Sequence, residues 1–254
     1  MITSFARLGP ALALLSLFAL EAAAARADDL TLSPKTGLDA FAALVDQELA
    51  NDRDELRIIA ATENAASGEW DRLRAPMAAF AGATPTNAAI WFARADGSYF
   101  TLDTGLRGEN LKDRAYFPRL LAGKEVLGEL VVSKSTGKRS TVIAVPLLKN
   151  GQVTGALGVS IEMERIAAMV EKDIGFPPHV MFYALNGEGQ IALHRESTLL
   201  FEFAEELGSQ SLTKAVKEML SKPEGTVRYE FQGAEREAIF KKSGVAGWVY
   251  ALRW

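Results

Sequence analysis

The segment LKDRAYFPRLLAGKEVLG, residues 111–128, carries the residues with the clearest capacity for binding chemistry: Arg114, Tyr116 and Phe117. An arginine guanidinium is a planar group that can pair with both oxygens of a carboxylate, and two aromatic rings can wall a pocket beside it. The same residues also suit an ordinary surface connection, because most arginines are solvated and most aromatic rings fill a core. The segment therefore indicates either a carboxylate site or an amphipathic loop.

Residues typical of catalysis or metal binding are scarce. The chain has two histidines, His179 and His194, and no cysteine, so neither a histidine-based metal site nor a His-dependent catalytic triad is expected. The pairs Asp96-Gly97 and Asn150-Gly151 are typical of hairpin turns and do not form a phosphate-binding loop. We therefore expect no enzymatic activity, no cofactor and no metal.

The composition is that of a protein that can bury a substantial core without disulfides. The 254 residues are 48% hydrophobic and 24% charged, and no cysteine is present. The net charge of −4 gives no basic excess for nucleic acid. The chain is long enough for one large domain or two small ones.

Residues 1–27 have the pattern of a cleavable secretory signal peptide. Arg7 precedes the apolar run LGPALALLSLFAL, and Ala25-Arg26-Ala27 forms an A-x-A cleavage site. The apolar run is short for a membrane span, and an uncleaved N-terminal anchor is the alternative interpretation. We expect cleavage after Ala27 and a soluble mature protein in a bacterial periplasm.

Helical periodicity comes first along the mature chain, and strand periodicity follows. Apolar residues at near-helical spacing predict one long helix over 36–66 and a shorter one over 69–81. Two sets of five short strands come next, and FARADGSYFTL and FYALNGEGQIAL show that the sets echo each other. The predicted fold is α+β. Its parts are the N-terminal helices (28–85), a first module (86–172) and a second, smaller module (173–254).

Strand alternation predicts which residues of the first module share a face. A two-residue turn at Thr136-Gly137 and a three-residue loop at 149–151 would place Ser140 opposite both Ser133 and Ser160. These hydroxyls then lie on a face of small residues with room for a ligand above it. A two-residue loop at Asn150-Gly151 would put a different residue opposite Ser160 and weaken the prediction.

The Asp96-Gly97 hairpin, taken as a two-residue turn, sorts its residues onto two faces. Small residues on a sheet face are also typical of a closely packed helix, so the face alone does not establish a pocket. One predicted face carries Trp91, Phe100 and Leu102, and the other carries Phe92, Tyr99, Thr101 and Asp103.

The order of these features resembles the double Cache family, the PAS-like extracellular sensor domains of bacterial chemoreceptors and sensor kinases. The most specific part is DRAYFPRLLAGKEV followed by STGKRSTVIAVPLLKNGQVTGALGVSI, and the resemblance covers roughly residues 36–254. It implies a long N-terminal helix followed by two tandem PAS-like modules with antiparallel sheets. It also implies that the first module holds a ligand, that Arg114 grips a carboxylate, and that Tyr116 and Phe117 wall the pocket.

Two positions depart from the amino-acid-binding members of that family, which carry a tyrosine and an aspartate for the α-ammonium group. The matching positions here are Val131 and Ser160, so the resemblance favours a small organic acid over an amino acid. Asp103 is a candidate substitute acceptor for an ammonium group. The predicted ligand-binding residues are Arg114, Tyr116, Phe117, Ser133, Ser140, Ser160, Asp103 and Thr101.

The resulting hypothesis is a stand-alone periplasmic sensor that binds a small carboxylate in its first module. It would signal through a separate partner, a membrane sensor kinase or a chemoreceptor. The alternative is a ligand-free docking module for a membrane sensor kinase. In either case the long helix is a candidate face for a homodimer. The second module shows no counterpart to Arg114 with its aromatic neighbours, so no ligand-binding residues are predicted there.

Overall fold

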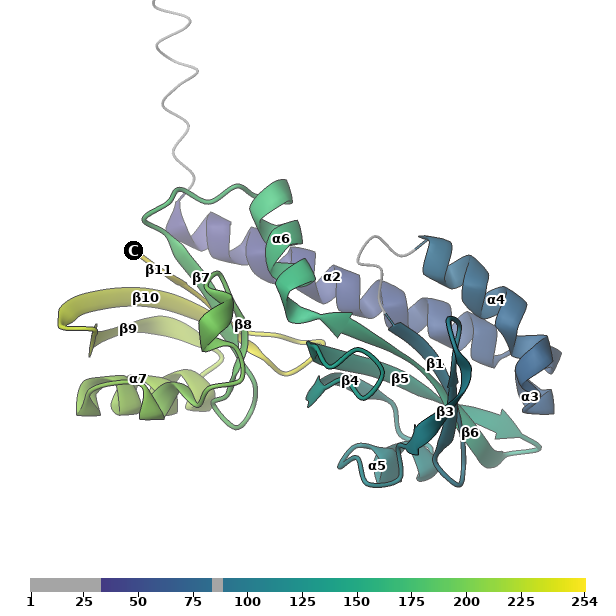
Figure 1. The fold of residues 1–254 in the computed structure, drawn as a ribbon. Coiled ribbons are helices and arrows are strands. Elements are labelled where there is room, and N and C mark those ends of the chain that lie inside the picture. The colour runs from purple at the N-terminus through teal and green to yellow at the C-terminus, as the bar shows by residue number, and fades with distance from the viewer. Residues whose placement is uncertain (1–32, 84–88) are drawn as a thin grey trace, which may run out of the picture.

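The computed structural model describes residues 33–83 and 89–254, which fold into two antiparallel sheets beside one long helix (Figure 1). This is the α+β architecture that the sequence predicts. The expected signal peptide, residues 1–27, lies outside the described residues. Within the described ranges, no helix combines the length and the apolar character needed to cross a bilayer.

The long helix α2 spans Pro34–Ala60 and begins where the sequence supplies a cap. The Ser33 hydroxyl accepts a hydrogen bond from the Thr36 amide at 3.2 Å. Pro34 occupies the first turn, where its missing N–H leaves no intrahelical bond unmade. Local sequence therefore fixes the start of the element that later contacts both sheets.

The prediction of one continuous helix over 36–66 is wrong at its C-terminal end. Helix α2 ends at Ala60, and Thr62 caps a separate short helix, α3 (Glu63–Ser67). A threonine hydroxyl competes well for free amide groups, so it starts a new helix here instead of continuing the old one. Helix α4 (Trp70–Ala83) follows close to where the sequence predicts it.

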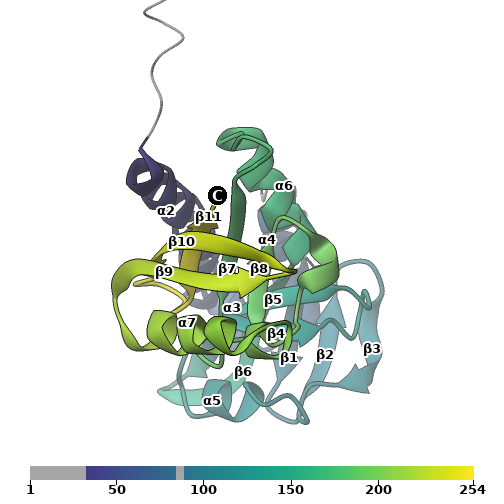
Figure 2. The same ribbon diagram turned by 90° about the vertical axis from the view of Figure 1, so that its left-hand side faces the viewer.

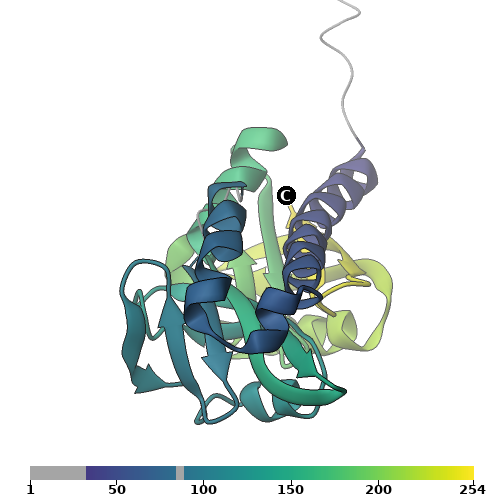
Figure 3. The same cartoon turned by 90° about the vertical axis from the view of Figure 1, so that its right-hand side faces the viewer.

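The first sheet has six strands in the order β3-β2-β1-β6-β5-β4. The five-strand prediction misses the edge strand β3, GLRGEN, because it has two glycines and no apolar alternation. Helices α2, α3 and α4 cover one face of this sheet, and α5 (Phe117–Leu121) covers the other (Figures 1 and 3). The strands are β1 Ala89–Arg94, β2 Ser98–Thr101, β3 Gly105–Asn110, β4 Val126–Val132, β5 Arg139–Lys149 and β6 Gln152–Glu162.

The turn between β4 and β5 has four residues, 134–137, where the sequence predicts two. The Ser133 amide donates to the Lys138 carbonyl at 2.8 Å and closes the turn. Val131 consequently pairs with Ser140, so Ser133 is not opposite Ser140 as predicted. The displacement is two residues, and an even displacement leaves the predicted faces of the strands unchanged.

The loop between β5 and β6 has two residues, Asn150 and Gly151, where three are predicted. Their φ angles of 53° and 78° are those of a tight hairpin turn in which both central residues are left-handed. A bulge further along the strands restores the alternation, and Ser160 pairs with Val142 instead of Ser140. The predicted opposition of Ser140 and Ser160 is therefore wrong, although both remain on the predicted face.

The prediction for the hairpin between β1 and β2 is wrong by one residue. Phe92 pairs with Phe100, and Trp91 pairs with Thr101, so the loop has three residues, 95–97. A shift of one residue moves a side chain to the other face of the sheet. Phe92 and Phe100 accordingly stack on the α2 side, with centroids 5.8 Å apart, and Trp91 lies on the face that α5 covers.

The second sheet has the five predicted strands, in the order β8-β7-β11-β10-β9. This order repeats β2-β1-β6-β5-β4 of the first sheet, and helix α7 (Gln210–Ser221) precedes β9 as α5 precedes β4. Helix α7 lies on the opposite side of its sheet from α2 (Figure 2). Along the chain, helix α6 (Met163–Asp173) connects the last strand of the first sheet to the first strand of the second sheet. The strands are β7 Met181–Leu185, β8 Ile191–His194, β9 Glu224–Phe231, β10 Ala234–Lys242 and β11 Val249–Arg253.

The predicted helix over 198–221 begins later than expected. Two short 3-10 turns, Ser197–Leu199 and Ala204–Glu206, come first, and α7 starts after its cap residue, Ser209. The Ser209 hydroxyl accepts a hydrogen bond from the Leu212 amide at 3.3 Å. As at Thr62, a hydroxyl cap inside an apolar pattern sets the helix boundary.

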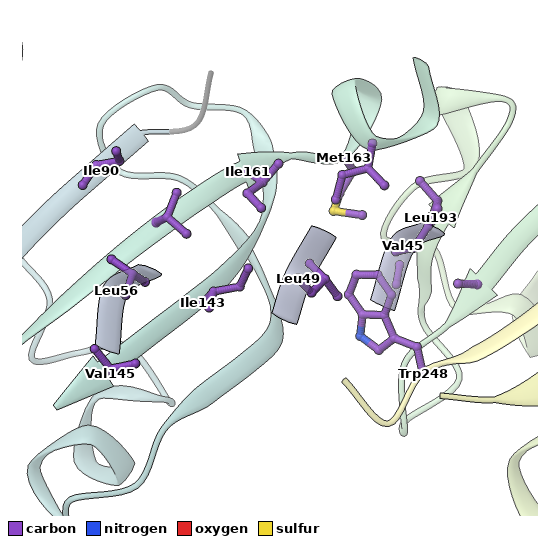
Figure 4. Packing of buried hydrophobic residues seen from close by; sticks show 14 of the residues in the cluster. Val45, Leu49, Leu56, Ile90, Ile143, Val145, Ile161, Met163, Leu193 and Trp248 are labelled. Carbon is purple, nitrogen blue, oxygen red and sulfur yellow. The ribbon is translucent and has the colours of Figure 1, made fainter. Parts of the chain in front are cut away.

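One continuous hydrophobic core joins α2 to both sheets (Figure 4). Val45, Leu49 and Leu56 of α2 are fully buried in it. On the first-sheet side they meet Ile143, Val145 and Ile161, and on the second-sheet side Leu193 and Trp248. The Trp248 indole also donates a hydrogen bond to the Gly128 carbonyl of β4 at 3.1 Å, which ties the two sheets together directly.

Candidate functional site

The segment between β3 and β4, residues 111–125, covers the face of the first sheet that points away from α2; we call it the lid. Phe117 and Leu120 of α5 are buried there in a hydrophobic cluster. At the C-terminal end, Glu125 accepts hydrogen bonds of 2.6 and 2.7 Å from the Arg57 guanidinium of α2. Apolar packing and this bidentate pair therefore hold the lid against the sheet.

A small cavity of about 20 Å³ lies between the lid and the sheet. A single water needs about 10–15 Å³ on this measure, so the cavity is the size of one or two waters. Arginine, lysine, tyrosine, serine and tryptophan supply hydrogen-bond donors around it, and no acidic residue is among the described residues that line it. The lining residues are Trp91, Tyr99, Leu111, Arg114, Tyr116, Val131, Ser133, Lys134, Ser135 and Ser160.

Arg114 reaches the cavity from the lid, as the sequence predicts. Its Nη2 donates to the Val132 carbonyl at 2.6 Å, at the end of β4. Among the described residues, no carboxylate forms an ion pair with this guanidinium. The Arg114 guanidinium at the cavity therefore bonds to a neutral acceptor and has no carboxylate partner among the described residues.

Lys134 is a second cation at the cavity that the sequence analysis misses. Its Nζ donates to both carboxylate oxygens of Asp113 at 2.6 and 2.8 Å, and to the Asn110 carbonyl at 2.5 Å. The Lys134 charge, acting mainly through this hydrogen bond, holds the pKa of the Asp113 carboxyl below its usual value. The longer β4–β5 turn places Lys134 here, and a two-residue turn would not have done so.

Trp91 forms the floor of the cavity together with Ser160. The indole Nε1 donates to the Ser160 hydroxyl at 3.2 Å, and the ring lies 6.4 Å from the Tyr116 ring, centroid to centroid. Gly158 makes this position available, because a Cβ at that residue would lie 2.1 Å from the indole. Trp91 is absent from the predicted site because the hairpin register was wrong by one residue.

Two tyrosines lie beside the cavity. Tyr99 is 2% exposed, and its hydroxyl makes no hydrogen bond of normal geometry with any described residue. Burial raises its pKa, while the nearby Arg107 guanidinium lowers it. Burial also raises the pKa of Tyr116. Both phenols are therefore neutral donors at physiological pH, and Tyr99 lacks the partner that a buried hydroxyl usually has.

Four of the eight predicted ligand-binding residues meet at this cavity: Arg114, Tyr116, Ser133 and Ser160. The other four do not line it. Phe117 belongs to the lid but packs into the hydrophobic cluster against the sheet, and the Ser140 hydroxyl donates to the Lys138 carbonyl at 3.2 Å. Thr101 and Thr104 share a hydrogen bond of 2.8 Å, and Asp103 is exposed in the turn after β2.

The sequence matches the profile of the Cache domain family, dCache_1, over residues 21–253. This chain belongs to the Cache domain family. Cache domains are non-catalytic ligand-binding modules of extracellular sensors, so the chain is a sensor module of this type and not an enzyme. No curated protein matches it by sequence.

Several solved structures share the fold of this Cache protein. The ligand-binding domain of the Pseudomonas aeruginosa PAO1 amino acid chemoreceptor PctB, in complex with L-Arg, has a TM-score of 0.69 at 16% identity, covering 85% of this chain and 90% of that one. The sensory domain of the Campylobacter jejuni chemoreceptor Tlp3, with isoleucine bound, has a TM-score of 0.63 at 13% identity, covering 87% and 90%.

A third structure is the extracellular ligand binding receptor from Desulfohalobium retbaense DSM5692, with a TM-score of 0.70 at 14% identity. The match covers 87% of this chain and 40% of the receptor, so this chain spans less than half of the receptor's length. At these identities the likeness establishes the shared fold.

Proposed function

We propose that this Cache protein is a periplasmic sensor that binds a small organic acid in its first module, with the acid's carboxylate on Arg114. The observation that carries the proposal is the lining of the cavity under the lid. Arg114 is a cation without a carboxylate partner among the described residues, Lys134 adds a positive charge that is paired with Asp113, and no described lining residue is acidic. The tyrosines and Ser160 have hydroxyl hydrogens to donate, whereas the Trp91 N–H is already bonded to Ser160. A set of this kind stabilises an anion, because charge-assisted hydrogen bonds are stronger than neutral ones.

The preference for an organic acid over an amino acid rests on the missing acceptor. PctB and Tlp3 have been solved with amino acids bound, and an α-ammonium group requires an acceptor, most often a carboxylate. The positions expected to provide one carry Val131 and Ser160. Asp103, the expected substitute, is exposed and does not line the cavity.

Binding would require the lid to move. The cavity of about 20 Å³ has the size of one or two waters, which is too small for an acid of four or more heavy atoms. An incoming carboxylate would replace the Val132 carbonyl as the acceptor for Arg114, exchanging a neutral acceptor for a charged one. Ligand binding would thus release the lid from the end of β4 while holding Arg114 on the ligand.

The same strand offers a route to the second module. Val132 ends β4, and Gly128 in its middle accepts the hydrogen bond from Trp248. A change in the contact between lid and β4 would therefore act on the strand that touches the second sheet. We propose that a membrane sensor kinase or chemoreceptor reads this change as a shift between two populations of the protein.

Thermal unfolding of the chain against a panel of organic acids and amino acids tests the proposal. A ligand present at about 100 times its Kd stabilises the folded state by roughly 2.7 kcal/mol. Each compound is measured on the wild type, on Arg114→Ala and on Lys124→Ala. Lys124 is an exposed cation of the lid that does not line the cavity, so its variant controls for the loss of one charge from this segment.

We expect one or more organic acids to raise the Tm of the wild type and of Lys124→Ala, and to have no effect on Arg114→Ala. Stabilisation by amino acids alone would contradict the organic-acid preference. Stabilisation that persists in Arg114→Ala would move the site away from the lid.

A ligand-free docking module is the second candidate function, and the small volume of the cavity favours it. In that case no compound would change the Tm of any variant. Capture of a membrane sensor kinase would then occur equally with and without small molecules.

A further inference from the structure

The second module contains a cavity in the same structural position as the one under the lid. It lies between the second sheet and α7, on the face that points away from α2. Because the strand orders of the two sheets repeat, α7 before β9 is the counterpart of α5 before β4. The cavity measures about 40 Å³, twice the volume of the first.

Four polar side chains face this otherwise apolar cavity: Tyr183, His194, Tyr229 and Arg253. The backbone of Tyr183 pairs with that of His194, so their side chains share one face of the sheet, with rings stacked 6.0 Å apart. The hydroxyls of Tyr183 and Tyr229 share a hydrogen bond of 3.2 Å. All four residues come from strands, so the sheet holds the polar groups in place.

Arg253 is the charge of this site. Within the described ranges, no carboxylate forms an ion pair with its guanidinium, which lies 5.8 Å from the Phe231 ring centroid. Its charge acts on its neighbours: it lowers the pKa of His194 and opposes the rise that burial causes in the pKa of Tyr183 and Tyr229. The cavity therefore has a positive potential without an anion among the described side chains.

His194 contributes a donor, and its tautomer follows from its backbone contact. Burial, the larger effect, and the Arg253 charge lower its pKa to about 4, so the ring is neutral at pH 7. Nδ1 accepts a hydrogen bond from the Glu196 amide at 2.8 Å, so it carries no hydrogen. The hydrogen of the neutral ring must therefore be on Nε2, and no bond from Nε2 to a described residue uses it.

The volume of this second cavity and its apolar walls limit the class of ligand that can bind there. A volume of about 40 Å³ corresponds to roughly three to four water-sized groups, which limits the ligand to the shortest carboxylates, those with a tail of one or two carbons. Apolar side chains form the rest of the wall and suit an apolar tail. They include Leu185, Ile191, Leu199, Leu212, Val216 and Met219.

We propose that the second module holds a binding site of its own for a short-chain monocarboxylate such as acetate or propionate. Arg253 carries the charge, the hydroxyl of the Tyr183–Tyr229 pair whose hydrogen is not used in their mutual bond and the Nε2–H of His194 donate hydrogen bonds, and the apolar wall takes the tail. The site does not depend on Arg114 or on the proposed ligand of the first module. A short acid would thus bind both modules or the second alone.

Proton NMR of the histidine rings gives a direct test, because the chain has two histidines, one exposed (His179) and one buried in this cavity (His194). A His179→Gln variant assigns the two signals. Sodium propionate is then titrated against sodium chloride at equal ionic strength, into the wild type, Arg114→Ala and Arg253→Gln. Arg228→Gln removes an exposed cation of β9 that pairs with Glu237, outside this cavity, and is the matched control.

We expect propionate, and not chloride, to shift the His194 signal saturably in the wild type, Arg114→Ala and Arg228→Gln. Arg253→Gln should weaken this binding about tenfold or more, the loss expected when a charge-assisted hydrogen bond is removed. If Arg253→Gln fails to fold, Tyr229→Phe, which keeps the ring and removes one donor, replaces it and should weaken binding severalfold. An unchanged His194 signal, saturation only above about 1 mM, or loss of the effect in Arg114→Ala would overturn the proposal. The last result would assign propionate to the first module and leave the proposed function standing.

Discussion

Asp52 should destabilise this protein at neutral and alkaline pH, and replacing it with asparagine should remove that effect. Asp52 lies on α2, is 4% exposed, and its Oδ2 has no hydrogen-bond partner among the described residues. Burial raises the pKa of this carboxyl to about 7, with Glu48 and Glu55 of the same helix adding to the rise. The unfolded chain releases this proton near the ordinary value of 3.8.

The sign follows from proton binding. Between pH 3.8 and about 7 the folded state holds a proton that the unfolded state has lost, so stability falls as the pH rises through this range. A shift of about three pKa units corresponds to about 4 kcal/mol, and access of water to the carboxylate reduces it. We therefore expect Asp52→Asn to raise the free energy of unfolding by about 1–4 kcal/mol at pH 8 and to leave it unchanged near pH 4.

Urea unfolding of both proteins at pH 4, 6 and 8 measures this difference. Asp54→Asn is the control, because Asp54 is exposed on the same helix, and a hydrogen bond from Arg53 lowers its pKa instead of raising it. That variant should not gain stability at pH 8. A gain for Asp52→Asn of equal size at pH 4 and pH 8, or a loss at pH 8, would refute the reasoning.

Two further predictions concern packing. Gly158→Ala should lower the free energy of unfolding in urea by about 1–3 kcal/mol, because the new methyl group would lie 2.1 Å from the Trp91 indole. Gly108→Ala is the control, because nothing lies within 4 Å of its new methyl group. It should change the free energy of unfolding by less than about 1 kcal/mol. Equal effects of the two would contradict the proposed contact. Trp248→Phe should cost about 1–3 kcal/mol, because it leaves the buried Gly128 carbonyl without its donor, and a neutral result in the same assay would show that this bond does not hold the sheets together.

The sequence predicts the faces of β4, β5 and β6 well and their pairing poorly, for one physical reason. Apolar alternation determines which residues point to the same side, whereas turn length determines which residues lie opposite. At Ser140 the β4–β5 turn error displaces the pairing by two residues, and on the β6 side a one-residue turn error and a bulge together do the same, so the predicted face survives. At Trp91 the error is one residue, and the side chain that forms the cavity floor was assigned to the wrong side.

The residues of the candidate site divide in the same way, into those that local sequence identifies and those that only the pairing of strands and turns brings into place. Arg114 and Tyr116 are identifiable because their residue types stand out in a connection, and the structure places both at the cavity. Lys134 is an ordinary turn residue in the sequence, and only a four-residue turn brings it to Asp113. Arg253 is also hard to identify from the sequence, since its place beside the stacked tyrosine and histidine depends on pairing between residues of β7 and β11 that are 64 to 72 positions apart. Contacts made across the fold leave no local pattern.

Helix α2 couples the stability of the two sheets to each other. Because one stripe of α2 fills the core under both sheets, neither sheet can lose its cover without exposing the apolar surface of the other. The two sheets should therefore melt together, as a single cooperative unit, even though each has its own strands and its own cavity. Free energy gained by binding in either cavity then protects the whole molecule. Two weak ligands, each in its own module, would add their stabilisation in one folding equilibrium.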